Sequence, residues 1–494
     1  MPFSKIFLVI LISVMTLTAC SSVGHNDILK ASEDIQGSYI NENNLSQSLY
    51  VTKWWETIND QTLNDNVTVL LNQNLALKEA GERIIQNNER IAQANSSFFP
   101  NLTASTTGSR SFQNTGAQGI AGDFGNARFY NTNYNPGLQS SWEIDLFGRI
   151  RNSTNAAQSS FIASQFDKEA LTQSLIAQLV NIRVNIETHK TLLEIAQEIA
   201  YNRSQVYDLV KRRYDLGLES IKLSTVYLAE DRMKTAQSEI YQYETLLSSS
   251  LYAYDILLGQ KPGTTNHKSL NLDLNQNLPA VSTCLPAALI DMRPDLKAAR
   301  ARVNASGYNV KVAMADLYPS LNLSAALGFS GNETKNLFTA EQLAGSILGS
   351  LTSSIFQGGR IKSTIRIRES EAREISYNYA GQILEAISDV ENFLKAKHNV
   401  TNEIIDIEQS IFALKRSEDL IYNRYIQGIE TLQNVLDARQ SLLIAQQRKT
   451  LKQQEKWHSH VGLILALGGN WFDNNNSCDK DNTLNPKEEN SDEK

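Results

Sequence analysis

Two carboxylates, Glu143 and Asp145, are the side chains whose types and spacing could most readily do chemistry in this 494-residue chain. They stand two residues apart in a segment of alternating residues, so both would project from the same face of a strand. Two carboxylates on one face could work as a general acid and a general base, or they could line a water-filled passage. We favour lining, because no other group suited to catalysis accompanies the pair in the sequence.

Histidines, methionines and catalytic motifs give no support for an enzyme or a metal site. The six histidines are scattered, and His458 and His460, two residues apart, would point in different directions from a helix. The five methionines form no ladder that could carry copper or silver. A nucleophile elbow, a phosphate-binding loop and an HExxH motif are missing from the sequence. We therefore predict a protein with no enzymatic activity, no metal and no non-covalent cofactor.

The segment that carries the two carboxylates alternates between apolar and polar residues. One face would carry Leu138, Ser140, Trp142, Ile144 and Leu146, and the other Gln139, Ser141, Glu143 and Asp145. This period of two is typical of a strand with one apolar and one wet face. Gly148 ends the alternation, and a polar, alanine-rich segment with helical character begins at Arg149.

The same passage from a strand into a helix occurs again about 211 residues later, where Arg360 matches Arg149. We therefore predict two repeats of one plan, over 20–280 and 281–470. The first repeat would contain strands near 101–112 and 138–147 and long helices over 149–214 and 220–258. The second would contain strands near 320–330 and 346–356 and long helices over 360–426 and 430–467. A loop rich in Gly, Asn and Tyr would occupy 113–136, and an acidic disordered tail would occupy 471–494.

Apolar residues at spacings of three and four indicate that the predicted helices pack along one stripe. Nine prolines in the whole chain leave room for long helices, and residues 152–214 include neither glycine nor proline. A helix of about 65 residues would extend for roughly 100 Å at about 1.5 Å per residue. The net charge of −7 comes without a basic cluster, which argues against nucleic acid as a partner.

Residues 1–19 resemble a bacterial lipoprotein signal peptide. A positive start and a short apolar core lead to the cleavage motif Leu17-Thr18-Ala19-Cys20. The resemblance implies cleavage before Cys20, covalent lipid on Cys20, and sorting to the outer membrane because Ser21 rather than Asp follows. An ordinary signal peptide with a chance cysteine is the alternative. In an oxidising compartment, Cys284 and Cys478 could form one disulfide or remain two free thiols.

The apolar faces of the predicted strands cannot be covered within one chain. Four strands are too few for the smallest common membrane barrel, which has about eight, and an isolated hairpin is only marginally stable. A chain at the outer membrane could cover these faces with lipid if several copies pooled their strands into one barrel. Glu143 and Asp145 would then line the water-filled interior, since outward-facing carboxylates are costly at mid-membrane depth.

Short motifs spread over nearly the whole mature chain resemble the TolC-like outer-membrane factors, in particular their lipoprotein branch. In chain order the motifs are Trp54-Trp55, Phe99-Pro100, Ser141–Arg149, Arg293–Leu296, Tyr318-Pro319, Phe356–Arg360 and Val435–Ala438. The resemblance implies an α+β membrane protein that assembles as a homotrimer. Three copies with four strands each would share a twelve-stranded β-barrel, continued by a long α-helical coiled-coil tunnel across the periplasm.

The resemblance also implies a gate at the periplasmic end of this tunnel. Asp437 stands where family members carry an aspartate that forms a ring of carboxylates in the trimer. Relatives often carry a charge one turn earlier or an arginine three residues later, where this chain has Asn434 and Gln440. Arg439 lies close to these positions without matching them. The alternative role for Asp437 is an ordinary solvated charge on a helix.

The same resemblance assigns the turns at the helix ends to a periplasmic adaptor protein. The residues concerned are Arg213, Tyr214 and Gly217 in the first repeat and Arg424, Tyr425 and Gly428 in the second. Helix capping is the simpler role for these residues, and for the two glycines it is the one we favour.

The function implied by the resemblance is that of the outer-membrane channel of a tripartite efflux pump, a passive exit duct for drugs and other small toxic compounds. Its partners would be a periplasmic adaptor, an inner-membrane transporter of the RND or another class, and outer-membrane lipid. Two other functions stay open from the sequence. One is the duct of a type I protein-secretion system, and the other is a structural coiled-coil lipoprotein without a channel.

Overall fold

The computed structural model describes residues 53–114, 128–217, 222–264, 270–279, 281 and 292–469. The chain divides into two compact units. The first unit contains Ile84–Ser164 and Ala299–Ala380, and the second contains the described parts of Glu33–Arg83, Gln165–Ala298 and Gly381–Lys494. Several long helices belong to both units, and each unit is described here by itself.

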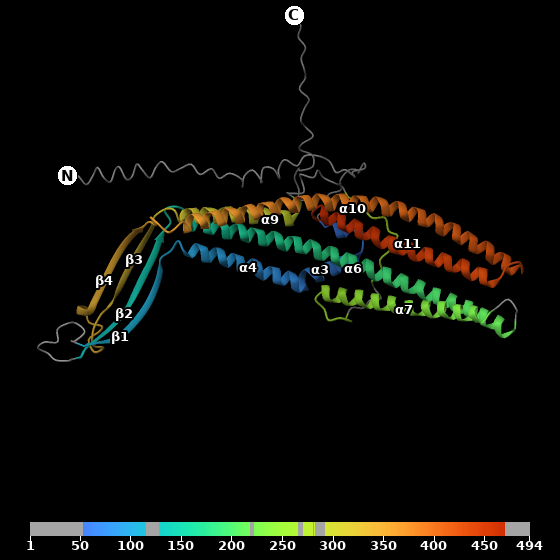
Figure 1. Ribbon diagram of the computed structural model, residues 1–494, viewed down its shortest axis with the longest axis horizontal. Coiled ribbons are helices and arrows are strands. Elements are labelled where there is room, and N and C mark those ends of the chain that lie inside the picture. Colours follow the sequence, from blue (N-terminus) through green and yellow to red (C-terminus); the bar gives the residue numbers. More distant parts are fainter. Residues whose placement is uncertain are drawn as a thin grey trace, which may run out of the picture. The chain divides into compact units, whose positions relative to one another are not determined.

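A single four-stranded sheet dominates the first unit (Figure 1). Its strands are β1 (Asn101–Asn114), β2 (Arg128–Ile144), β3 (Ser320–Phe329) and β4 (Leu343–Thr352), and they pair in chain order. Every pairing is antiparallel. Both repeats therefore contribute one hairpin to the same sheet, and β1 and β4 are its outer strands.

The prediction of a loop over 113–136 was wrong at both ends. β1 continues to Asn114, and β2 already begins at Arg128, where the two residues pair. The polar composition of this segment was misleading, because a strand with one wet face needs asparagine, serine and threonine at every second position. In the second repeat, β4 ends at Thr352 rather than near 356.

The strand register divides the sheet into two chemically different faces. Paired residues share a face, and successive residues of a strand alternate between faces. One face, the apolar face, carries Leu102, Leu138, Trp142, Ile144, Leu321, Leu323, Leu327, Leu343, Ile347 and Leu351. The other, the polar face, carries mainly Thr103, Thr107, Ser109, Asn133, Asn135, Gln139, Ser141, Asn322, Ser324, Ser346 and Ser350. Among the residues of the four strands, Glu143 is the one charged residue on the polar face.

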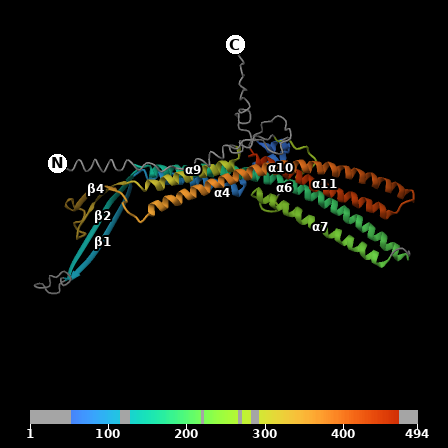
Figure 2. The same ribbon diagram turned by 45° about the horizontal axis from the view of Figure 1, so that its top comes forward.

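Long helices follow the strands of each hairpin. α6 (Arg149–Asp215) and α10 (Arg360–Ile426) each have 67 residues, which corresponds to roughly 100 Å. α6 lies beside α7 (Leu223–Leu257), and α10 lies beside α11 (Leu432–Ala466), in both views (Figures 1 and 2). The shorter helices are α3 (Gln61–Gln73), α4 (Leu75–Ser96) and α9 (Pro294–Ala315). Of the helices described, none is long and apolar enough to cross a membrane.

Small and branched apolar side chains join the helices of the second unit. Ile199 and Ala200 of α6 pack with Ala236 of α7 and with Leu443 of α11, which is fully buried. Val206 and Val210 of α6 form a further cluster with Val226 and Ala229 of α7, and Leu436 of α11 packs against it. This core fixes the relative heights of the polar residues on the three helices.

Ion pairs of buried and partly buried arginines connect the short segments of the second unit to the long helices. Arg183 on α6, 2% exposed, forms an ion pair at 2.7 Å with Asp60, which also accepts the Leu63 N–H at the start of α3. Arg293 binds Asp295 at 2.7 Å, and its guanidinium also lies 3.6 Å from Asp389 of α10. The arginine of the Arg293–Leu296 motif therefore ties the start of α9 to α10.

Candidate functional site

The two carboxylates singled out in the sequence lie where β2 passes into α6. Glu143 belongs to β2 and accepts hydrogen bonds from Arg149, the first residue of α6, through its Nε at 2.8 Å and also through Nη2. Asp145 lies just beyond the strand, and its two oxygens accept the N–H groups of Ile150 and Arg151 at 3.1 Å and 2.9 Å.

These partners change the interpretation of the pair. Asp145 is not part of the strand face as predicted, because it satisfies free backbone donors in the first turn of α6, where negative charge is also favoured by the helix dipole. Glu143 does lie on the polar face, but as half of an ion pair. Neither carboxylate is placed as a free acid or base, and lining of a passage stays a prediction for both.

The junctions of the two repeats meet around one cavity of about 310 Å³. Glu143, Asp145 and Arg149 of the first repeat line it together with Asp316 and Arg360 of the second. Phe147 and Tyr318 also line the cavity, and their rings stack with centroids 4.8 Å apart. The motifs that end in arginine thus position the strands against the first turns of the helices.

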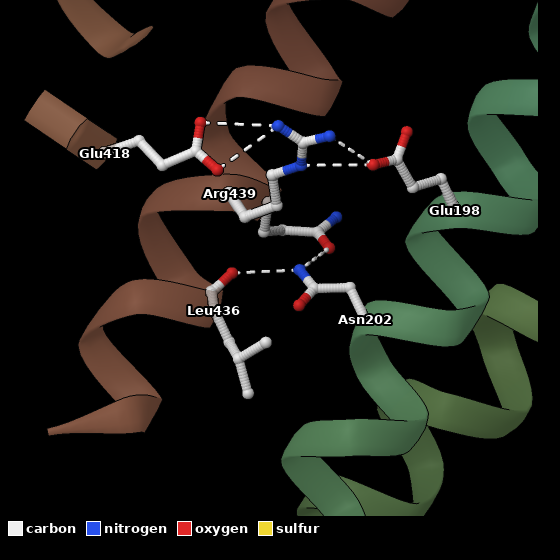
Figure 3. A network of polar contacts seen from close by, with 6 residues as sticks. Glu198, Asn202, Glu418, Leu436 and Arg439 are labelled. Carbon is white, nitrogen blue, oxygen red and sulfur yellow. Dashed lines mark hydrogen bonds and ion pairs between the residues drawn. The ribbon is translucent and has the colours of Figure 1, made fainter. Parts of the chain in front are cut away.

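A polar network joins three helices in the second unit and surrounds the predicted gate residues (Figure 3). Arg439 of α11 donates to Glu198 of α6 through Nε at 3.1 Å and also through Nη2, and it donates through Nη1 to Glu418 of α10 at 3.2 Å. A buried amide lies next to it, because Asn202 of α6 donates to the Leu436 carbonyl at 2.9 Å. We refer to Glu198, Asn202, Glu418 and Arg439 as the three-helix network.

Asp437 lies beside this network without joining it. Its side chain is 52% exposed, and its nearest cation is Arg203 of α6 at 3.9 Å. Burial lowers the pKa of Arg203, the neighbouring Arg232 lowers it further, and Asp437 opposes both effects. A half-exposed carboxylate with one distant partner keeps the freedom to face a second copy or a cation, so the gate role stays a prediction for Asp437.

Asn434, the second predicted gate residue, belongs to the cap of α11. Its backbone N–H donates to the Thr431 hydroxyl at 3.3 Å, and its amide donates to Glu430. This hydrogen bond from Asn434, with the Thr431 N–H next, lowers the pKa of Glu430. The structure therefore gives Asn434 a helix-capping role, separate from the three-helix network to which Arg439 belongs.

The predicted adaptor-docking residues lie at the ends of α6 and α10. Gly217 and Gly428 follow these helices with φ of 69° and 73°, the left-handed conformation that glycine adopts without strain. The Gly217 N–H donates to the Tyr214 carbonyl and the Gly428 N–H to the Tyr425 carbonyl, both at 2.9 Å. Arg213 lies in the last turn of α6, and Arg424 in that of α10, 4.0 Å from Glu430.

Sequence reasoning missed three members of the three-helix network. Glu198 lies 241 residues from Arg439, and Glu418 lies 21 residues from it across a turn between helices. Local spacing carries no signal for such pairs, because only the packing of α6, α10 and α11 brings them together. Cys20, Cys284, Cys478 and the tail over 471–494 lie outside the described residues. In the described part of the chain, no group of three or more acidic, histidine or cysteine side chains could hold a metal.

Comparison with known proteins places this architecture in a family. The chain is 27% identical to the pyoverdine export outer membrane protein OpmQ of Pseudomonas putida, over 86% of this chain and 90% of that protein. It is 25% identical to the probable efflux pump outer membrane protein TtgC of the same species, over 85% of each.

Solved structures agree in fold. The outer-membrane channel OprN matches with a TM-score of 0.72 at 24% identity, covering 88% of this chain and 99% of that one. The Campylobacter jejuni CmeC outer membrane channel matches with a TM-score of 0.74 at 24% identity, covering 87% and 90%. The family model described as outer membrane efflux protein matches residues 67–260 and 285–469. The predicted family and fold class are therefore confirmed: the chain belongs to the outer membrane efflux protein family and has the TolC-like fold.

Proposed function

We propose that three copies of this chain form the passive exit duct of a tripartite efflux pump, from the periplasm through the outer membrane. The four-stranded sheet is the observation that supports this proposal most directly. It has an apolar face suited to lipid and a polar face suited to water, and β1 and β4 are left as its outer strands. Exposed apolar strands with open edges are unstable in water, and closure with further copies removes the edges.

The long helices continue this duct on the periplasmic side and carry its gate. The three-helix network links α6, α10 and α11 in the closed form, and the half-exposed Asp437 beside it supplies the carboxylate of the gate ring. The turns at Gly217 and Gly428 are the surface for a periplasmic adaptor, which couples the duct to an inner-membrane transporter. No chemical step is needed, because the pump supplies the energy.

The relatives support small molecules as the cargo. They are named for pyoverdine export, antibiotic efflux and toluene efflux. The lining of the polar face, serine, threonine and asparagine with one ion-paired carboxylate, offers neutral hydrogen-bonding groups along the barrel. Such a lining fits a duct that accepts varied cargo, with charge selection confined to the gate.

Deletion of the gene and complementation with plasmid copies test this proposal. We expect the deletion to make cells hypersensitive to small toxic compounds and to raise the intracellular level of a fluorescent efflux substrate, and the wild-type copy to restore both. Unchanged sensitivity together with loss of a secreted protein would instead support the type I secretion duct. No change in either property would support the structural lipoprotein.

The lipid anchor is a separate part of the proposal. We propose that Cys20 carries lipid after removal of 1–19, which would hold the chain at the inner leaflet of the outer membrane. Labelling of cells with radioactive palmitate should mark the wild-type protein and leave the Cys20→Ser variant unlabelled. Equal labelling of both would rule out Cys20 as the acceptor.

A further inference from the structure

Basic and aromatic side chains gather on the apolar face of the sheet, at the strand ends furthest from the helices. Arg110 and Phe112 of β1 and Arg128 and Tyr130 of β2 all lie on this face by register. The Arg110 guanidinium lies 4.8 Å from the centroid of the Tyr130 ring, and that of Arg128 lies 5.5 Å from the Phe112 ring. The two rings are 6.2 Å apart and more than half exposed.

The segment after β3 adds a third cation to this group. Tyr134 and Gly331 exchange two backbone hydrogen bonds, of 2.8 Å and 3.1 Å, and these hold the segment against β2. As a result Lys335 and Arg110 line the same hollow of about 600 Å³. We refer to Arg110, Phe112, Arg128, Tyr130 and Lys335 as the basic–aromatic rim.

The positive charge of the rim is not neutralised within the described residues. No ion pair joins Arg110, Arg128 or Lys335 to a carboxylate there, and Glu333 is the one acidic residue that lines the hollow. The polar face carries no charged residue at this level of the strands. The rim therefore offers its charge outward, away from the interior through which cargo would pass.

The depth of the rim follows from strand geometry. A residue advances about 3.3 Å along a strand, and a strand tilt of about 40° leaves roughly 2.5 Å of height per residue. The apolar residues from Leu321 to Phe329 therefore span about 20 Å, close to the height of about 25 Å typical of the lipid-facing band. Gly328 pairs with Gly137, so the band, which ends at Phe329, ends level with Pro136 of β2. Arg110 pairs with Thr132, four residues further along β2, and therefore lies about 10 Å above the end of the band.

We propose that the basic–aromatic rim binds the phosphates of an anionic glycolipid in the outer leaflet, the phosphorylated headgroup of lipopolysaccharide. The planar guanidinium groups suit phosphate oxygens, and the adjoining rings suit the boundary between acyl chains and headgroups. Such binding goes beyond the exit duct and rests on it only in placing the sheet in the outer membrane. The bound lipid would fix the height of the barrel in the membrane.

Binding of defined lipids to the purified full-length protein tests the proposal by native mass spectrometry. The probes are lipid A with two phosphates and the same lipid without phosphate. The variant is Arg110→Gln with Arg128→Gln and Lys335→Gln. The matched control is Lys362→Gln with Arg366→Gln, two exposed cations on α10. We expect the wild type and the control to retain phosphorylated lipid A, and the rim variant to retain about tenfold less.

The comparison of lipids in the wild type needs no variant and so decides the matter even if the rim variant assembles poorly. Equal retention of lipid A with and without phosphate would overturn the proposal. So would equal retention by the rim variant and the control, or displacement of the lipid by millimolar inorganic phosphate. Channel conductance of the rim variant, which should match the wild type, separates this result from any failure of the duct itself.

Discussion

Arg439 of α11 and Glu198 of α6, which are 241 residues apart in the chain, form a hydrogen-bonded ion pair that joins the two helices. The same guanidinium reaches Glu418 of α10, so one side chain connects three helices (Figure 3). In the proposed gate these helices separate when the tunnel opens, so the link between them must be weak enough to break. A partly exposed ion pair fits, because such pairs contribute only about 0.2–1 kcal/mol each.

Replacement of Arg439 by Gln should loosen this link. Loss of two partly exposed ion pairs removes about 0.4–2 kcal/mol from the closed form, which would raise the open population by roughly two- to thirtyfold. Cells that carry the variant should become sensitive to a large antibiotic that the outer membrane normally excludes. Arg448→Gln, an exposed arginine on the same helix, is the control. Equal sensitivity of the two variants would show that the three-helix network does not keep the gate closed.

The two faces of β4 give a direct test of the barrel orientation. Ile347, 87% exposed in the single chain, lies at mid-strand on the apolar face, and its neighbour Ser346 lies on the polar face. Ile347→Asp should cost up to a few kcal/mol per chain in lipid and reduce the yield of heat-resistant trimers, whereas Ser346→Asp should assemble normally. The two variants are compared on semi-native gels. Loss of trimers in Ser346→Asp alone would reverse the face assignment.

The buried ion pair between Arg183 and Asp60 should couple the N-terminal segment to α6. Arg183→Leu leaves the Asp60 carboxylate without its cation, which costs about 3–5 kcal/mol for a buried pair. Asp60→Asn alone should cost a similar amount. The double variant should be more stable than the sum of the single losses predicts, because it buries no unpaired charge. Denaturant unfolding in detergent measures this cycle, and strict additivity would show that the two groups do not interact.

His460 should make the protein sensitive to acid. It is 1% exposed, and within the described residues neither ring nitrogen has a hydrogen-bond partner. Burial, together with the positive charges of Lys397 and Lys456, lowers its pKa to about 3. Above the ordinary histidine pKa of about 6.5 both folded and unfolded chains are neutral, so stability is unaffected there. As pH falls towards 3 the unfolded chain gains the proton first, and the native state loses stability.

At pH 5 this difference amounts to about 2 kcal/mol. His460→Leu should therefore flatten the fall in thermal stability between pH 7 and pH 5. The exposed His398 serves as the control, and His398→Gln should follow the wild-type profile. If the His460→Leu profile runs parallel to that of the wild type, the pKa of His460 is the same in the folded and unfolded chains, and the prediction is wrong.

The periodic parts of the structure could be predicted from the sequence. The helices expected over 149–214 and 360–426 are α6 (Arg149–Asp215) and α10 (Arg360–Ile426) in the structure. Freedom from proline and a regular apolar stripe were enough, because packing along one face dominates long helices. The polar ends of the strands, furthest from the helices, were not predictable in the same way. Over 128–136 a water-facing strand and a polar loop have nearly the same composition.

The site was predictable only where it follows local chemistry. Gly217 and Gly428 adopt the left-handed conformation expected after a helix, which a single chain segment determines. Asp145 looked like a strand residue because the alternation runs two residues past the strand, yet it binds the N–H groups of Ile150 and Arg151. The partners of Arg439 are set by the packing of three helices that are distant in the sequence, so no sequence motif predicts them.

Planar-bilayer conductance of the purified wild-type protein tests most directly whether three copies enclose one gated duct. The wild type should insert as a trimer with a small, mostly closed conductance, and Arg439→Gln combined with Asp437→Ala should show larger and more frequent openings. A trimer that conducts no ions in either form, or a sample that stays monomeric in mild detergent and never inserts, would contradict the shared barrel.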